Sequence, residues 1–263
     1  MSTTDTPKLD ASSRPKVNVS GWKKVGPQGG SNPGGIYRDD DGQRYYVKRP
    51  NGGDEATHNE VIAGAFYAAL GVNTNTVMLA RDGDEPGLLI ASPWINNDRS
   101  AATRALYGSD DRAAEFLGKV RADFAVDAWL GNYDVIGIGP YNLVGDEAGN
   151  PLRLDPGASM MCKAMGRLKP WWGPDVSEID DMRYGSKKSV SYSTPPYFFG
   201  SMSDDDVAQS AEKLLDITPE QINAIVLSSG LEGGVKAHLA ATLITRRANI
   251  LSRFGITDQG ATR

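Results

Sequence analysis

The chain has 263 residues, of which 40% are hydrophobic and 23% charged, with a formal net charge of −5. These values are typical of a globular protein with a sizeable core, arranged as one large domain or two small lobes. The acidic balance argues against a nucleic-acid-binding surface, which draws on clustered Lys and Arg. Cys162 is the single cysteine, and neither His58 nor His238 has companion ligands at zinc-like spacing. An internal disulfide is therefore excluded and a zinc site is disfavoured.

The two ends of the chain predict tails and no targeting segment. Residues 1–17 are rich in Ser, Thr, Asp, Pro and Lys, which predicts a disordered tail, and residues 257–263 form a second short tail. The chain does not open with a charged segment followed by an apolar stretch, and no apolar run reaches the roughly 18 residues of a membrane span. We therefore expect a cytoplasmic protein, with secretion by a signal-peptide-independent route left open.

Residues 18–95 predict a small lobe built on an antiparallel sheet. Strand-like residues around Ile36 and over 44–48 flank an Asp-Gly turn, which favours a hairpin. Residues 55–70 predict one helix, which Gly71 ends. Residues 74–80 and 88–95 then predict two further strands.

Residues 96–256 predict a larger, mainly helical lobe. Its expected elements are a long buried helix over 112–130, a short hairpin made of 143–144 and 152–154, a helix from a capping box at Thr218 to Gly230, and a last helix over 234–254. Residues 158–203 show little periodicity, which is typical of a functional or mobile segment. The predicted fold class is α+β in two lobes, and such chains commonly bind their ligand between the lobes.

A glycine-rich loop precedes the predicted strand around Ile36, and we interpret it as lying between two strands. Its residues are Gly29, Gly30, Ser31, Asn32, Pro33, Gly34 and Gly35. A position between two strands excludes a Walker-type phosphate loop, which joins a strand to a helix. Small residues there let backbone N–H groups approach phosphates closely, so we interpret the loop as a phosphate-binding flap. The alternative is a flexible hairpin tip.

A lysine and then a glutamate follow this loop, in the order expected of a phosphate-binding site. Lys48 ends the next strand, from which its side chain can reach under the loop toward phosphate oxygens. Glu60, on the following helix, is the expected ion-pair partner of Lys48. Glu55 remains the alternative partner, because Glu60 lies at the edge of the apolar face of that helix.

Three oxygen-bearing side chains follow the long predicted helix. Asp134 lies in a glycine-punctuated loop that ends at Asn142, and the hairpin then leads to Asp155, which Pro-Gly follows. Phosphoryl transfer needs a carboxylate near the acceptor hydroxyl, and an amide oxygen with a second carboxylate on Mg²⁺. Each residue alone could be a simple cap, but the ordered set favours this chemistry.

The whole arrangement resembles the kinase-like superfamily, and most closely its atypical branch of phosphoinositide-kinase-like and HipA-type bacterial kinases, including small bacterial and phage-encoded members. The matching segments are the loop 29–35, Val47-Lys48, Asn59-Glu60, Gly131-Asn-Tyr-Asp134, Asn142 and Leu154-Asp-Pro-Gly157. The resemblance implies a two-lobed kinase-like fold. It also implies an ATP- and Mg-dependent phosphotransferase.

The resemblance also implies roles for individual residues. Adenine is expected against the connection 91–95, with Ser92 and Trp94 as contacts, and Mg²⁺ on Asn142 and Asp155. Asp134 is the expected catalytic base, and a protein Ser or Thr hydroxyl, possibly in the chain itself, the expected acceptor. The interval from Asp134 to Asn142 is longer than in those families, and no His-Arg-Asp precedes it. Asp127 therefore stays an alternative base.

The same departures leave other reactions open. AMP transfer in place of phosphorylation is one alternative, and a lipid or small-molecule acceptor is another. A non-catalytic nucleotide-binding pseudokinase or interaction module is the rival from a different class.

Overall fold

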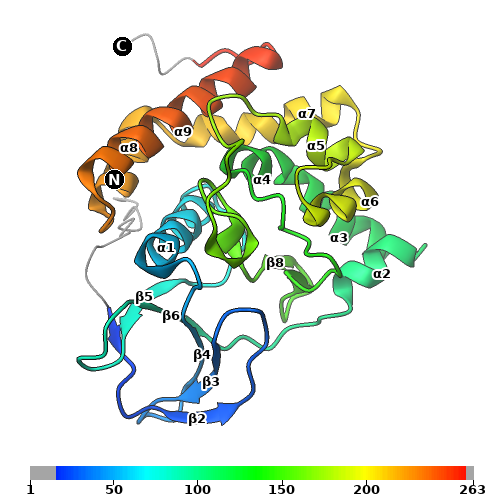
Figure 1. Cartoon of the computed structure of the whole chain (residues 1–263). Helices are drawn as coiled ribbons and strands as arrows, with labels where there is room; N and C mark the ends of the chain where they lie inside the picture. The colour runs from blue at the N-terminus through cyan, green and yellow to red at the C-terminus, as the bar shows by residue number, and fades with distance from the viewer. Residues whose placement is uncertain (1–15, 259–263) are drawn as a thin grey trace, which may run out of the picture.

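The computed structural model describes residues 16–258, and Figure 1 shows a sheet at one end of the molecule and a body of helices at the other. The sheet has six strands in the order β1-β5-β6-β4-β3-β2. Their bounds are β1 Val17–Asn18, β2 Lys23–Gly26, β3 Gly34–Arg38, β4 Arg44–Lys48, β5 Met78–Arg81 and β6 Leu89–Pro93. The small sheet lobe and larger helical lobe are thus arranged as the sequence predicts.

One strand pairing departs from the predicted antiparallel sheet. Strand β1 runs parallel to β5, with Val17 opposite Ala80, whereas the other neighbours in the sheet are antiparallel. Val17, which we assigned to the N-terminal tail, therefore belongs to an edge strand. Residues 1–15 of that predicted tail lie outside the described residues. At the other end, Asp258 of the predicted C-terminal tail accepts a hydrogen bond from Arg247.

The helical body contains eight α-helices among the described residues, besides α1 at its boundary with the sheet. Their bounds are α2 Ala101–Tyr107, α3 Asp111–Ala122, α4 Phe124–Leu130, α5 Glu178–Tyr184, α6 Pro195–Phe199, α7 Asp204–Ala211, α8 Pro219–Ser228 and α9 Gly233–Arg253. The hairpin of β7 (Leu143–Gly145) and β8 (Pro151–Arg153) and the 3₁₀ turns η1 (Pro156–Ala158), η2 (Ala164–Gly166), η3 (Val190–Ser193) and η4 (Glu212–Asp216) complete it. No helix within residues 16–258 is long and apolar enough to cross a bilayer.

The prediction of one long helix over 112–130 is wrong, because the helix is interrupted at Asp123. There α3 ends and α4 begins. At the break, the Asp123 carboxylate forms ion pairs with Arg153 and Lys213. The apolar periodicity continues across the break because both helices pack on the same core.

The segment 158–203 is more ordered than its lack of periodicity predicts. It contains α5 and α6, and Tyr192, Phe198 and Phe199 are fully buried in the main core. Short helices separated by Pro and Gly give no long repeat in the sequence, although both helices bury apolar side chains, such as Met182 of α5. Packing is therefore the role of these aromatic residues.

Helix α1 (Gly53–Ala69) lies between the sheet and the helical body (Figure 1). Its side chains Ile62, Phe66 and Tyr67 are fully buried in the main core of the helical body. The sheet has a separate, smaller core, which includes Val47 and Ala91. A helix that we counted with the sheet lobe is therefore anchored in the other lobe.

A buried arginine on α9 holds segment 158–203 against α4. The Arg246 guanidinium donates to the carbonyls of Ala128, Trp129, Gly173 and Asp175 and to the Glu178 carboxylate, at 2.7–2.8 Å. All five N–H groups are satisfied, as burial of a guanidinium requires. A second arginine of α9, Arg253, pairs with Asp180 at the surface.

Substitution of these two arginines is expected to lower the free energy of unfolding by different amounts. Arg246→Met leaves the Glu178 carboxylate buried without a countercharge, so we expect a loss of about 3–5 kcal/mol in the free energy of unfolding. Arg253→Met removes an exposed pair and should cost about 1 kcal/mol or less. Urea denaturation of both variants measures the difference. Equal small losses would contradict the bracing role of Arg246.

Candidate active site

The centre of the site is the amino group of Lys48 at the end of β4. It lies 2.9 Å from Glu60 Oε1 and 3.0 Å from Asp155 Oδ1, and the residue is 7% exposed. Burial alone would lower the pKa of Lys48, but the charges of Asp155 and Glu60 outweigh it and hold that pKa above its usual value. Lys48 is therefore a charged ammonium that joins sheet, helix α1 and the loop after β8.

Glu60, and not Glu55, is the glutamate that reaches Lys48. Glu60 is buried in the second turn of α1, whereas Glu55 is exposed in the first turn. Burial raises the pKa of Glu60 to about 7, with Lys48 opposing that shift. The next neighbour of the carboxylate is Gly157, where a Cβ atom would lie 2.8 Å from Glu60 Oε2. This close approach explains the glycine after Asp155-Pro.

Asp155 and Asn142 meet at the same end of the β7–β8 hairpin. Leu154 N donates to Asn142 O at 2.9 Å, which extends the strand pairing by one step. The Asp155 side chain is 42% exposed, and its Oδ1 also accepts from Gly157 N at 3.1 Å. Burial raises the pKa of Asp155, but the ammonium of Lys48 outweighs that effect and lowers it. Asp155 is thus an open, ionised carboxylate.

Asp134 lies beside Asn142 in the loop after α4. Asn142 Nδ2 donates to Asp134 O at 2.9 Å and to Asp134 Oδ2 at 3.3 Å. The amide nitrogen is therefore turned toward Asp134, and the amide oxygen is left for another partner. Burial raises the pKa of Asp134 to about 6, with a hydrogen bond from Ser191 opposing it. A carboxylate with a pKa in this range suits proton transfer near neutral pH.

Asp127, the alternative base, has a different place in the structure. Its carboxylate is fully buried and accepts from Arg153 Nε at 2.8 Å, Arg153 Nη2 at 2.7 Å and the Tyr67 hydroxyl at 2.8 Å. All of these partners are internal side chains. Asp127 therefore braces the hairpin strand β8 against α4 and α1.

The glycine-rich loop folds back over the start of α1. Asn32 Oδ1 accepts from Asn51 N at 3.0 Å, and Ser31 O accepts from Asn51 Nδ2 at 3.4 Å. Gly29 N donates to the Tyr46 hydroxyl at 3.0 Å, so this N–H group is already used. Gly30 has no neighbour within 4 Å of an added Cβ.

Gly34 and Gly35, at the end of this loop, continue into β3. Gly34 pairs with Lys48 and Gly35 with Val47. The loop is thus joined directly to the strand that carries Lys48.

Ser92 and Trp94 lie on the neighbouring strand and just beyond it. Ser92 is opposite Tyr46 in the register, so its side chain lies on the same face of the sheet as Tyr46 and Lys48. Trp94 N donates to Arg44 O, and the guanidinium of Arg44 lies 5.6 Å from the Trp94 ring centroid. The structure therefore brings Ser92 to the face of Lys48 and stacks Trp94 on Arg44.

Asn59 is a site residue that the sequence analysis left without a role. It is fully buried, and its Nδ2 donates to Ser159 O at 2.9 Å and more weakly to Gly157 O at 3.4 Å. It fixes the loop after Asp155 to α1. The only sequence signal is its position next to Glu60, which does not indicate a backbone partner about 100 residues away.

Cys162, by contrast, has no reactive character. It is buried, and burial raises the pKa of its thiol to about 11.

The donor set around Asp155 fits a magnesium ion. Mg²⁺ takes oxygen ligands and is usually held in proteins by one or two carboxylates. Asp155 offers an exposed carboxylate, and Asn142 offers an amide oxygen at the same hairpin end. Among residues 16–258 no group of three His, Cys, Asp or Glu side chains is arranged around a common point. The candidate site thus consists of one carboxylate and one amide.

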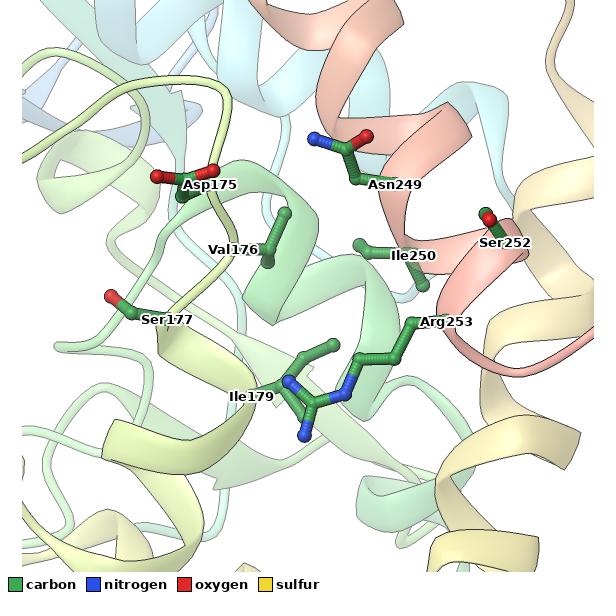
Figure 2. A pocket seen from close by; sticks show the side chains of 8 residues that line it. All are labelled: Asp175, Val176, Ser177, Ile179, Asn249, Ile250, Ser252 and Arg253. Atoms are coloured by element: carbon green, nitrogen blue, oxygen red, sulfur yellow. The ribbon is translucent and has the colours of Figure 1, made fainter.

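A separate pocket of about 530 Å³ lies between the start of α5 and the end of α9 (Figure 2). It is lined by Asp175, Val176, Ser177, Ile179, Asn249, Ile250, Ser252 and Arg253. Arg253 already donates two hydrogen bonds to the Asp180 carboxylate. None of the predicted site residues lines this pocket, so it is distinct from the candidate active site.

No protein-family model matches the chain, and no curated protein matches it. The Helicobacter pylori proinflammatory kinase CtkA is similar in structure, with a TM-score of 0.56 and 14% identity over 94% of this chain and 98% of that one. A MAP kinase, LmaMPK10 from Leishmania major, aligns with a TM-score of 0.35 and 10% identity over 93% and 84%. The likeness to CtkA confirms the kinase-like fold predicted from the sequence, while the HipA-type branch stays a prediction.

Substitution by alanine is expected to lower the stability of the protein at Gly34 but to change it little at Gly30, in the same loop 29–35. A Cβ at Gly34 would lie 2.3 Å from Val47 O and 2.9 Å from Lys48 Cα, so Gly34→Ala must push β3 away from the strand that carries Lys48. We expect a loss of about 1–3 kcal/mol in the free energy of unfolding. Gly30→Ala, in open space, should change it by about 0.5 kcal/mol or less. Urea denaturation compares the two, and equal effects would contradict this packing.

Proposed function

We propose that the chain is an ATP- and Mg-dependent phosphotransferase. The observation that carries the proposal is the buried ammonium of Lys48 between Glu60 and Asp155. Arg153 also pairs with two carboxylates, but both of those are largely buried, whereas Asp155 beside Lys48 is an open carboxylate with a 42% exposed side chain. Kinase-type sites use such a lysine for phosphate oxygens, a glutamate to hold it, and an aspartate for the metal.

The residues have the following proposed roles. ATP is the substrate, bound between the sheet and the helical body, with adenine near Ser92 and Trp94 and phosphates under the loop 29–35. Lys48, held by Glu60, contacts the α- and β-phosphates. Asn142 and Asp155 would hold Mg²⁺, which neutralises charge on the phosphates when it is bound. Asp134 orients the acceptor hydroxyl and accepts its proton.

The proposed acceptor is the hydroxyl of a protein Ser or Thr. Ile138 and Tyr141, in the loop between Asp134 and Asn142, are 64% and 71% exposed, and Val190 is exposed one residue before Ser191. Thr194 Oγ1 donates to Ile138 O at 3.0 Å, so this loop and the η3 region lie together. Exposed apolar side chains around the base suit a polypeptide better than a small polar metabolite. A hydroxyl of the chain itself is one such acceptor.

Labelled ATP separates the alternatives. The protein is incubated with γ-labelled or α-labelled ATP, with Mg²⁺ or with a chelator, alone and with a protein extract. Metal-dependent transfer of the γ-label supports the proposal, and transfer of the α-label indicates AMP transfer instead. If nucleotide raises the melting temperature of the protein but neither label is transferred, the chain is a non-catalytic binding module.

Asp134→Asn is expected to reduce kcat by about 10²–10⁴-fold, the usual contribution of a general base. Nucleotide affinity should stay within about twofold, because Asp134 is proposed to contact the acceptor and not ATP. The matched control is Asp205→Asn, an exposed carboxylate in the first turn of α7. Steady-state kinetics and calorimetric ATP binding measure the two quantities. Wild-type kcat in Asp134→Asn would reopen the choice of base.

Lys48 and Glu60 are expected to act as a unit. Lys48→Met and Glu60→Gln should each lower kcat/KM for ATP, and the double variant should be little worse than the poorer single one. The expected coupling free energy is about 0.5–3 kcal/mol, the range for side chains in contact. Kinetics of all four proteins, with urea denaturation alongside, complete the cycle. Fully additive losses would show that Glu60 does not place Lys48.

A further inference from the structure

Lys169, in segment 158–203, is a buried lysine that the proposed chemistry does not use. It is 5% exposed, and its Nζ donates to Gly131 O and to Ala158 O, each at 2.6 Å. The amino group also lies 4.9 Å from the ring centroid of Tyr133. Its contacts are therefore two carbonyls and an aromatic face.

The lysine lacks the compensation that other buried cations of this protein have. Lys48 and Arg153 each pair with two carboxylates, and Arg246 pairs with Glu178. Within the described residues no ion pair involves Lys169. Burial lowers its pKa to about 7, with Glu178 opposing that shift. A buried ammonium without a countercharge is a poor source of stability. We therefore ask which parts of the chain its two hydrogen bonds connect.

The two carbonyls have equivalent positions relative to the candidate site. Gly131 caps the end of α4 and stands three residues before Asp134. Ala158 lies in η1 and stands three residues after Asp155. One amino group therefore connects the loop that carries the proposed base with the loop that carries the proposed metal ligand.

We propose that Lys169 is a positioning residue for phosphoryl transfer, which fixes the Asp134 loop relative to the Asp155 loop by joining Gly131 O to Ala158 O. This inference rests on the proposed function for its catalytic consequence. The geometric part, that Lys169 orders these two loops, stands without it. A misplacement of about 1 Å between reacting groups costs about 10²-fold in rate.

The test is Lys169→Met, which keeps most of the apolar stem of the side chain and removes its donors. Lys163→Met is the matched control, since Lys163 lies in the same segment but rests on the Trp171 ring at 4.8 Å. We expect kcat to fall about 10–100-fold in Lys169→Met with KM for ATP within about twofold, because Lys48 and the loop 29–35 are untouched. Lys163→Met should match the wild type.

Amide hydrogen exchange supplies a readout that does not depend on activity. Faster exchange in Lys169→Met confined to residues 131–142 and 155–160 supports the proposal. Unchanged exchange there, or faster exchange spread equally over α4 and α9, overturns it, since Lys169 would then be dispensable or a general core support. If the wild type transfers no phosphate, the proposed function fails while exchange still decides the role of Lys169. If Lys169→Met does not fold, Lys169→Gln, which keeps an N–H donor without the charge, is measured instead.

Discussion

The ammonium of Lys48 is buried, and a buried charge is tolerated only when countercharges surround it. Glu60 and Asp155 supply them from two distant parts of the chain, which constrains three elements at once. Strand β4 must end beside α1, and the loop after β8 must reach both. The two ion pairs of one lysine therefore join the sheet, helix α1 and the hairpin at a single point.

Helix α1 transmits this constraint to the rest of the body. Glu60 reaches the sheet, Asn59 holds the backbone after Asp155, and the Tyr67 hydroxyl donates to Asp127. All three side chains are buried, and the neighbouring turns of the helix pack in the main core. The glutamate of the site is consequently fixed by the helical body, so the Lys48–Glu60 pair depends on how the sheet rests on α1.

The sequence predicted the two lobes, a mainly antiparallel sheet and Glu60 as the expected partner of Lys48, because these depend on local patterns and on spacing. It could not predict the break at Asp123, whose carboxylate pairs with two cations distant in the sequence, Arg153 and Lys213. It left Glu55 and Glu60 both open, because the apolar face of α1 is not distinct when Thr57, His58, Asn59 and Glu60 are all buried. Long-range polar contacts of this kind leave no periodic signal.

The interval between Asp134 and Asn142 is long in the sequence but short in space. Asn142 N donates to Ile136 O at 3.3 Å, and Gly137 N to Asp134 O at 3.0 Å, so the loop closes on itself at its base. Gly137 has a φ of +82°, a conformation that favours glycine, and it turns the chain outward. Between them Ile138 and Tyr141 are exposed, while Asn142 returns to within hydrogen-bonding distance of Asp134. Sequence separation is therefore a poor measure of distance here, and the longer interval gives no reason to prefer Asp127, whose carboxylate Arg153 and Tyr67 already occupy.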